Sequence, residues 1–278
     1  MQDLALAVLR RIAEHSARVG WASSPAGPLR FAVRGPEGAT PLVLLHGLGD
    51  SLAGWAQVAP LLAKKFRLHL LDLPGHGLSG RPPDWRLGTL AAAVASYAEA
   101  LREPIVVGHS LGGWIALRLA LSRAVCPRGL VLVNPGGATL ARELWAPFRD
   151  LVSARDPAGA RRYLAAAFHK PPIALRLFPR EVIKAMWTDA ARGVLDAVVE
   201  EDFVRDAELS TLTGLSARGG ALPVRIVWGA RDRLLPAGTL DFFRRAIPHA
   251  QIRLLEDAGH LPHFEAPRAL AAAIAEPL

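Results

Sequence analysis

Residues 105–113 read Ile105-Val106-Val107-Gly108-His109-Ser110-Leu111-Gly112-Gly113. Such an apolar run is typical of a buried strand, and the residues that follow Ser110 have the composition of a helix. A serine between strand and helix, with glycines two positions before and after it, is typical of a sharp turn that exposes the hydroxyl. Side chains at Gly108 and Gly112 would collide across that turn. The pattern predicts a nucleophilic serine, and a Gly/Ser turn without chemistry is the alternative.

Strand-like and helix-like segments alternate along most of the chain. We expect strands at 29–33, 42–45, 66–71, 105–107, 130–133, 224–228 and 252–255. We expect helices at 88–102, 111–122, 237–246 and 267–275. This alternation predicts the α/β class, with a parallel sheet covered by helices on both faces.

The rhythm changes between Asn134 and Pro223, where helical stretches near 141–152, 157–168, 179–191 and 194–209 follow one another with no clear strand. We therefore expect residues 134–223 to form a helical insertion over one edge of the sheet. Residues 29–133 and 224–278 would form the core. Leu4, Val8 and Ile12 recur at helical spacing, so we expect 1–28 to be an N-terminal helical extension that packs on the body. Contact of that helix with lipid is the less favoured alternative.

The bulk composition narrows the class of protein. The chain has 278 residues, half of them hydrophobic, and a formal net charge of +8. Its basic residues are spread along the chain in runs no longer than pairs, which predicts an evenly basic surface and no nucleic-acid partner. The single cysteine, Cys126, excludes an intrachain disulfide and is expected to be a small buried or half-buried residue. No membrane span and no clear secretory signal are seen, which favours a cytoplasmic protein.

A serine nucleophile needs a base, and the base needs an orienting carboxylate. Asp232 and His260 each lie on a loop just after an expected strand. Loops at the carboxyl ends of parallel strands share one rim, so these side chains can converge with Ser110. The alternatives are a turn role for the aspartate and a loop or capping role for the histidine. In the order Ser110, Asp232, His260, we interpret the set as a catalytic triad.

Other polar residues near strand ends are weaker candidates. Asp72 heads a Pro-Gly turn and is expected to accept structural hydrogen bonds, and Asp257 lies at the exit of the strand that precedes His260. Asn134 is not a carboxylate. His260 and His263 have a spacing that suits a metal, but no third ligand is nearby, so no metal and no cofactor are expected.

An oxyanion site requires two backbone N–H donors. The residue after the nucleophile, Leu111, is expected to supply one from a helix N-terminus. The loop His46-Gly47-Leu48-Gly49 follows the strand 42–45, and Leu48 is expected to supply the second. His46 is expected to brace this loop, and His109 to point away from the reacting atoms.

Taken together, five segments resemble the α/β-hydrolase superfamily: 45–49, 72–79, 108–113, 228–232 and 259–267. The resemblance implies an eight-stranded, mostly parallel sheet with a cap after the sixth strand. It also implies acyl transfer to Ser110 and hydrolysis by water activated at His260. The serine nucleophile distinguishes the chain from the aspartate branches of that superfamily, so dehalogenase and epoxide hydrolase reactions are not expected.

The leading hypothesis is a serine hydrolase for a small-molecule carboxylic ester, of the carboxylesterase or lipase-like kind. Hydrolysis of a carbon–carbon bond in a diketone by the same triad and a non-catalytic binding protein on this fold are the alternatives. Cap aromatics are expected to line the substrate pocket, namely Trp145, Phe148, Phe168, Trp187 and Phe203. The sequence leaves the chain length of the acyl group and the oligomeric state open.

Overall fold

The computed structural model describes residues 2–199, 202–214 and 220–278. Its centre is an eight-stranded sheet with the order β1-β2-β4-β3-β5-β6-β7-β8. The strands are β1 (Arg18–Ala22), β2 (Leu29–Arg34), β3 (Pro41–Leu45), β4 (Arg67–Leu71), β5 (Ile105–His109), β6 (Gly129–Val133), β7 (Val224–Gly229) and β8 (Gln251–Leu255). β1 and β2 pair antiparallel, as do β2 and β4, and all later pairings are parallel. The expected α/β fold with a mostly parallel sheet is confirmed.

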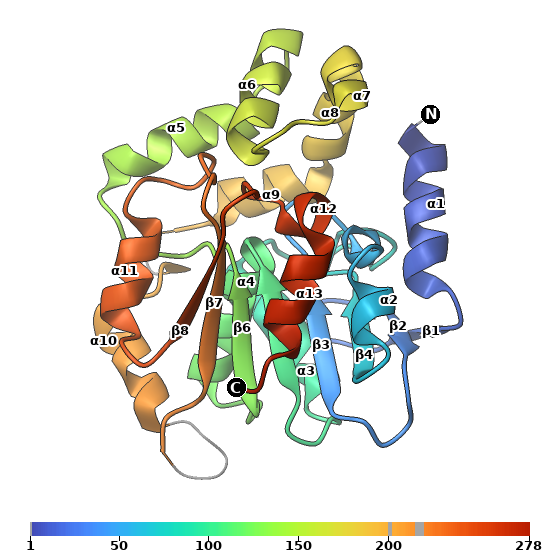
Figure 1. The fold of residues 1–278 in the computed structure, drawn as a ribbon, viewed down its shortest axis with the longest axis vertical. Coiled ribbons are helices and arrows are strands. Elements are labelled where there is room, and N and C mark those ends of the chain that lie inside the picture. Colours follow the sequence, from blue (N-terminus) through green and yellow to red (C-terminus); the bar gives the residue numbers. More distant parts are fainter. Residues whose placement is uncertain (1, 200–201, 215–219) are drawn as a thin grey trace.

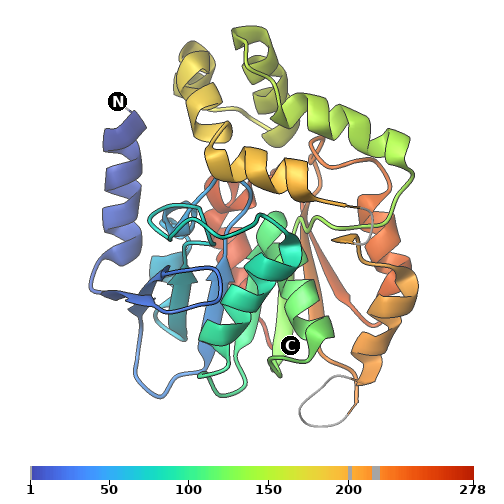
Figure 2. The same cartoon turned by 180° about the vertical axis from the view of Figure 1, so that it is seen from behind.

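Helices cover both faces of this sheet (Figures 1 and 2). One face packs against α3 (Leu87–Ala98), α4 (Leu111–Ser122) and α11 (Thr239–Ala246), and the other against η1 (Leu52–Trp55), α2 (Ala59–Leu62) and α13 (Pro267–Ala275). Neighbouring strand residues belong to opposite faces: Val106 is in the first core, whereas Ile105 and Val107 are in the second. Since both faces are covered, the central strands are apolar throughout rather than alternating.

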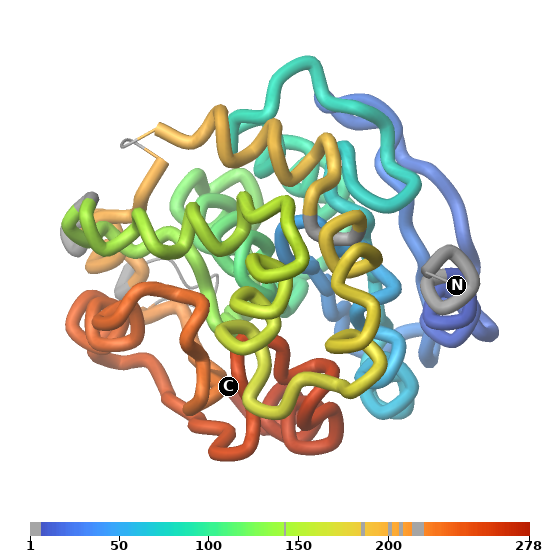
Figure 3. Tube along the Cα trace, turned by 90° about the horizontal axis from the view of Figure 1, so that it is seen from above, coloured from blue at the N-terminus to red at the C-terminus, as the bar shows by residue number. Residues whose placement is uncertain are grey.

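In the parts that the structure describes, the segment between β6 and β7 is mainly helical, as the sequence predicts. It contains α5 (Arg142–Val152), α6 (Pro157–Ala167), α7 (Ile173–Leu177), α8 (Pro179–Met186), α9 (Asp189–Ala197), α10 (Asp206–Ser210) and η3 (Thr211–Gly214). Seen from above, α5 to α9 lie over the carboxyl ends of the strands (Figure 3). A small core joins this cap to the loops beneath it, where Phe168 packs with Leu234, Leu261 and Phe264.

Three expectations about element boundaries need correction. The helical stretch expected at 194–209 is not continuous, because α9 ends at Ala197, Val204 forms an isolated β-bridge with Ala138, and α10 begins at Asp206. The segment 1–28 is not purely helical, because α1 (Gln2–Glu14) is followed by β1, which pairs with β2 and forms one edge of the sheet. This strand is short and largely exposed, so its sequence lacks the apolar pattern of a buried strand. In the cap, the stretch expected at 179–191 ends at Met186. Thr188 begins a new helix because its hydroxyl accepts a hydrogen bond from Ala191 N–H.

Candidate active site

Ser110 occupies the turn between β5 and α4 with φ of 51° and ψ of −113°. This is a conformation that residues other than glycine rarely adopt. The glycines two positions before and after Ser110 have no space for a side chain. A Cβ on Gly108 would lie 2.2 Å from the Gly112 carbonyl oxygen. One on Gly112 would lie 2.4 Å from the oxygen of Leu45. Ser110 N–H donates to the Val133 carbonyl at 3.0 Å, which holds the turn against the next strand.

The side chains of Ser110, His260 and Asp232 form a continuous chain of hydrogen bonds. Ser110 Oγ lies 3.0 Å from His260 Nε2, and His260 Nδ1 lies 2.8 Å from Asp232 Oδ2. The imidazole and the carboxylate are both buried. A proton on Nδ1 that donates to the carboxylate leaves Nε2 free to accept from the serine hydroxyl. The arrangement can therefore withdraw a proton from Ser110.

Asp232 is held as a carboxylate by several donors. Asn134 Nδ2 donates to Oδ2 at 2.6 Å, and the backbone N–H groups of Leu234 and Leu235 donate to Oδ1. Burial alone would raise the pKa of Asp232, but the attraction of His260 and these hydrogen bonds bring it below the ordinary value.

Asn134 is a positioning residue that the sequence analysis considered only as a rival acid. Its Oδ1 accepts from Gly229 N–H at 3.1 Å while its amide donates to Asp232, so it ties the end of β6 to the end of β7. Asn134 is fully buried and has φ of 41°. In the sequence, the available signal was a polar residue directly after an apolar strand, since a buried polar side chain there needs hydrogen-bond partners.

His109 supports the backbone of the base. Its Nε2–H donates to the carbonyl oxygen of His260 at 2.8 Å, and its ring lies 5.0 Å from the His260 ring, centroid to centroid. Burial keeps the pKa of His109 well below the ordinary value, so the ring is neutral. His109 thus supports His260 and also reaches the wall of the adjacent cavity.

The loop after β3 is braced by His46. Its Nδ1–H donates to the Gly47 carbonyl, and its Nε2 accepts from Leu73 N–H at 3.0 Å. Burial lowers the pKa of His46 to about 4, which keeps the ring neutral and able to accept at Nε2. This loop brings Leu48 to the cavity beside Ser110, while Leu111 is the first residue of α4.

Asp72 and Asp257 lie apart from this hydrogen-bonded chain. The carboxylate of Asp72 is buried and accepts from Leu52 N–H and Leu78 N–H at 2.7 and 2.8 Å. Burial raises its pKa above the ordinary value. Asp257 is exposed. His263 packs edge-on against His109, and the described residues contain no cluster of three or more His, Cys, Asp or Glu side chains suited to a metal ion.

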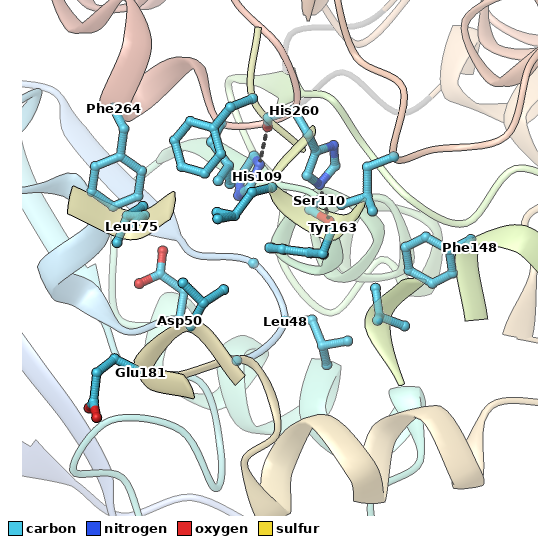
Figure 4. A pocket seen from close by; sticks show the side chains of 18 of the residues that line it. Leu48, Asp50, His109, Ser110, Phe148, Tyr163, Leu175, Glu181, His260 and Phe264 are labelled. Atoms are coloured by element: carbon cyan, nitrogen blue, oxygen red, sulfur yellow. Dashed lines mark hydrogen bonds between the residues drawn. The ribbon is translucent and has the colours of Figure 1, made fainter. Parts of the chain in front are cut away.

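A cavity of about 450 Å³ opens beside Ser110 and His260 (Figure 4). Its wall is mostly apolar and comes from the core loops and from the cap: Leu48, Phe148, Val152, Leu164, Phe168, Leu175, Phe178, Val182, Leu234, Leu261 and Phe264. Asp50, Glu181 and Tyr163 add polar groups. Asp50 and Glu181 lie on one side of Ser110 and Phe148 lies on the other.

The cap aromatics expected in the pocket divide into two groups. Phe148 and Phe168 line the cavity, but Trp145, Trp187 and Phe203 do not. Phe203 packs against Trp145 and Trp114, with ring centroids 5.2 and 4.8 Å apart. The guanidinium of Arg155 lies over Trp187. For these three residues the expectation of a lining position is corrected: they pack the cap and its connections.

Asp50 and Tyr163 are lining residues that the sequence analysis did not single out. Burial, together with the nearby charge of Asp72, raises the pKa of Asp50 to about 7, although Ser51 N–H donates to it at 2.7 Å. Burial raises the pKa of Tyr163, with Asp50 as the next cause. Asp50 directly follows the loop that carries Leu48, and that position was its sequence signal.

The chain is similar to known hydrolases along most of its length. The model of the alpha/beta hydrolase family matches residues 42–273. The pimeloyl-(acyl-carrier protein) methyl ester esterase of Yersinia pseudotuberculosis is 32% identical over 246 residues, which cover 83% of this chain and 90% of the relative.

Solved structures share the fold. A bacterial membrane phospholipase A has a TM-score of 0.80 at 23% identity, with 98% of this chain and 90% of that chain covered. A Bacillus subtilis carboxylesterase has a TM-score of 0.78 at 20% identity, with 98% and 95% covered. In the ranges that the structure describes, every helix is too short or too polar to cross a membrane.

Proposed function

The chain belongs to the alpha/beta hydrolase family, and from the geometry of its site we propose that it is a serine hydrolase that cleaves carboxylic esters through an acyl-enzyme. The observation that carries this proposal is the 3.0 Å separation of Ser110 Oγ from His260 Nε2, with Asp232 Oδ2 at 2.8 Å from the other ring nitrogen. That linkage makes an otherwise weak hydroxyl nucleophilic.

In the proposed acylation step, Ser110 Oγ attacks the ester carbonyl while His260 Nε2 takes the hydroxyl proton. Asp232 keeps the imidazole in the tautomer that has its proton on Nδ1 and stabilises the imidazolium that forms. The N–H groups of Leu48 and Leu111 bind the developing oxyanion, each stabilising the transition state by about 3 kcal/mol. His260 then gives its proton to the departing alkoxide, which leaves as the alcohol.

Deacylation follows the same path in reverse with water in place of the alcohol. His260 accepts a proton from the water as its oxygen attacks the acyl carbon, and the proton passes to Ser110 Oγ as the carboxylic acid leaves. The apolar cavity wall accommodates the acyl chain, with Phe148 and Phe168 among its contacts. No cofactor is needed for either step.

The charges in the cavity favour an ester over a carboxylate-bearing diketone. The described lining residues include Asp50 and Glu181 but neither lysine nor arginine. A substrate carboxylate would therefore meet Glu181, and Asp50 when it is ionised, with no cation among the lining residues to pair with. An ester with an uncharged acyl chain suits this wall, whereas a carboxylate-bearing diketone would need an arginine at the site.

Activity-based labelling separates the hydrolase from a binding protein. We expect a fluorophosphonate probe to label folded protein at Ser110, and Ser110→Ala to abolish labelling. A panel of p-nitrophenyl and methyl esters with acyl chains of increasing length would then define the substrate. Absence of labelling in folded protein would revive the binding-protein hypothesis, and a preference for carboxylate-bearing diketones would support the carbon–carbon hydrolase.

A further inference from the structure

Helix α7 is exposed along its whole length although it is largely apolar. Its sequence, Ile173-Ala174-Leu175-Arg176-Leu177, contains no buried residue. The exposed fractions are 71% for Ile173, 68% for Leu177, 46% for Phe178 and 36% for Leu175. Exposed apolar residues are common singly, but four within six positions concentrate apolar surface in one short segment, and such surfaces mark interaction sites.

The sequence on both sides of α7 is strongly basic. From Pro157 to Arg180 the sequence contains five Lys or Arg residues and neither Asp nor Glu. All five are exposed, and none forms an ion pair with another residue in the described ranges: Arg161, Arg162, Lys170, Arg176 and Arg180. The bounding acids have partners of their own, because Asp156 caps α6 and Glu181 pairs with Lys184.

The apolar and basic groups meet in a second groove, of about 630 Å³. Ile173 and Leu177 lie one helical turn apart and line it together with the guanidinium-bearing Arg161 and Arg176. We call Ile173, Leu177, Arg161 and Arg176 the α7 patch. Such a combination of aliphatic wall and cations suits a ligand that carries an acyl chain and an anionic head.

The α7 patch lies beside the wall of the catalytic cavity. Leu175 and Phe178, on and just after the same helix, line the cavity beside Ser110, and Leu164 lines both the cavity and the second groove. α6 and α7 project at the cap end of the molecule, away from the amino ends of the strands (Figure 1). A surface that met this end would therefore lie next to the part of the cap that lines the cavity.

We propose that the α7 patch docks the protein on an anionic lipid surface, with Ile173 and Leu177 entering the acyl boundary and Arg161 and Arg176 meeting the phosphate groups. The two arginines complement the charge of anionic phosphates, and Ile173 and Leu177 favour a lipid layer because a dissolved anion would not contact them. Docking would place acyl chains beside the helix that supplies Leu175 to the cavity wall. The proposal concerns binding and does not depend on the chemistry at Ser110.

Vesicle sedimentation tests this proposal with the full chain carrying Ser110→Ala, so that no lipid is consumed. We expect binding to vesicles of equimolar phosphatidylglycerol and phosphatidylcholine, and much weaker binding to pure phosphatidylcholine. The pairs I173S/L177S and R161Q/R176Q should each weaken binding to the anionic vesicles about tenfold or more. The matched pairs L61S/L254S and R128Q/R245Q, which change exposed residues elsewhere, should bind like the parent.

A second measurement checks that the variants fold. When the patch pairs are made in the protein that retains Ser110, both should hydrolyse a dissolved short-chain ester at the parent rate. None of the four residues lines the catalytic cavity. Equal vesicle binding by patch and control pairs would overturn the proposal. Binding of an acidic carrier protein through the α7 patch, without binding to vesicles, would also overturn it and assign the patch to a protein partner.

Discussion

Strands β5, β6 and β7 are buried along their whole length, whereas α7 of the cap has no buried residue. The sheet places Ser110, Asn134 and Asp232 at the ends of these neighbouring strands, where backbone hydrogen bonds leave little freedom. The cap lies across that rim and supplies much of the apolar cavity wall. We therefore expect the proposed chemistry to depend on the buried sheet, and the choice of substrate to depend on the cap, which has the smaller core.

The largest expected effect lies in the sheet. Ser110→Ala should lower kcat for a short-chain p-nitrophenyl ester about a millionfold, because the acyl-enzyme cannot form. Steady-state kinetics with an unchanged circular dichroism spectrum would check this. Retention of parent activity would refute the role of Ser110 as nucleophile. It would also refute the assignment of the chemistry to the sheet and of substrate choice to the cap.

Asp232→Asn should lower kcat about ten-thousandfold while leaving the fold intact, since an amide no longer selects the tautomer with its proton on Nδ1. Asn134→Ala should have a smaller effect, because it removes only one of the three groups that donate to the carboxylate besides His260. The two variants are compared by kcat at constant pH. Equal losses would mean that Asn134 matters as much as the acid itself.

Gly112→Ala tests how tightly the rim is packed. Its Cβ would meet the carbonyl oxygens of Leu45 and His46 at 2.4 and 2.6 Å, both of them backbone atoms. We expect the substitution to lower the free energy of unfolding by about 3 kcal/mol or to prevent folding. Gly88→Ala is the matched control, because nothing lies within 4 Å of its Cβ and it is helical. That change should stabilise the protein by about 0.5–1 kcal/mol in urea unfolding.

In the cap, Phe148→Ala should alter selectivity more than rate. Removing this ring enlarges the cavity, so the ratio of kcat/KM for long over short acyl esters should rise about tenfold. Trp145→Ala is the control: its ring lies 5.5 Å from that of Phe148 but does not line the cavity. The same change of this ratio in both variants would show that selectivity depends on packing throughout the cap rather than on the residues that line the cavity.

The smallest expected effect is a pH dependence set by Asp50. The carboxyl group is neutral below its pKa of about 7 and anionic above it. For esters whose acyl chain ends in a carboxylate, kcat/KM should therefore fall about fivefold, relative to neutral esters, as the pH rises through 7. Asp50→Asn should remove this relative decline. Persistence of the decline in the variant would point to Glu181 or to the bulk charge instead.

Local sequence predicted most of the sheet because a buried strand between two helical layers must be apolar, as in Leu42–Leu45 and Leu130–Val133. It missed β1, whose pairing with β2 is not a local property. It also led us to expect a buried or half-buried Cys126, whereas the structure shows this residue exposed on the connection after α4. Short, exposed segments carry too little hydrophobic signal for their environment to be predicted.

The order of Ser110, Asp232 and His260, each just after a strand, was sufficient to predict that their side chains converge, since parallel strands end at one rim. Other properties required the folded chain: the bridge made by Asn134, the raised pKa of Asp50, the cavity wall that includes Phe148 but excludes Trp145, and the exposed apolar helix beside a basic groove. The residues that follow each strand can be predicted from the hydrophobic periodicity of the local sequence and from the order of the elements along the chain. Burial, electrostatic environment and cavity shape depend on which distant segments meet, and only packing in three dimensions decides that.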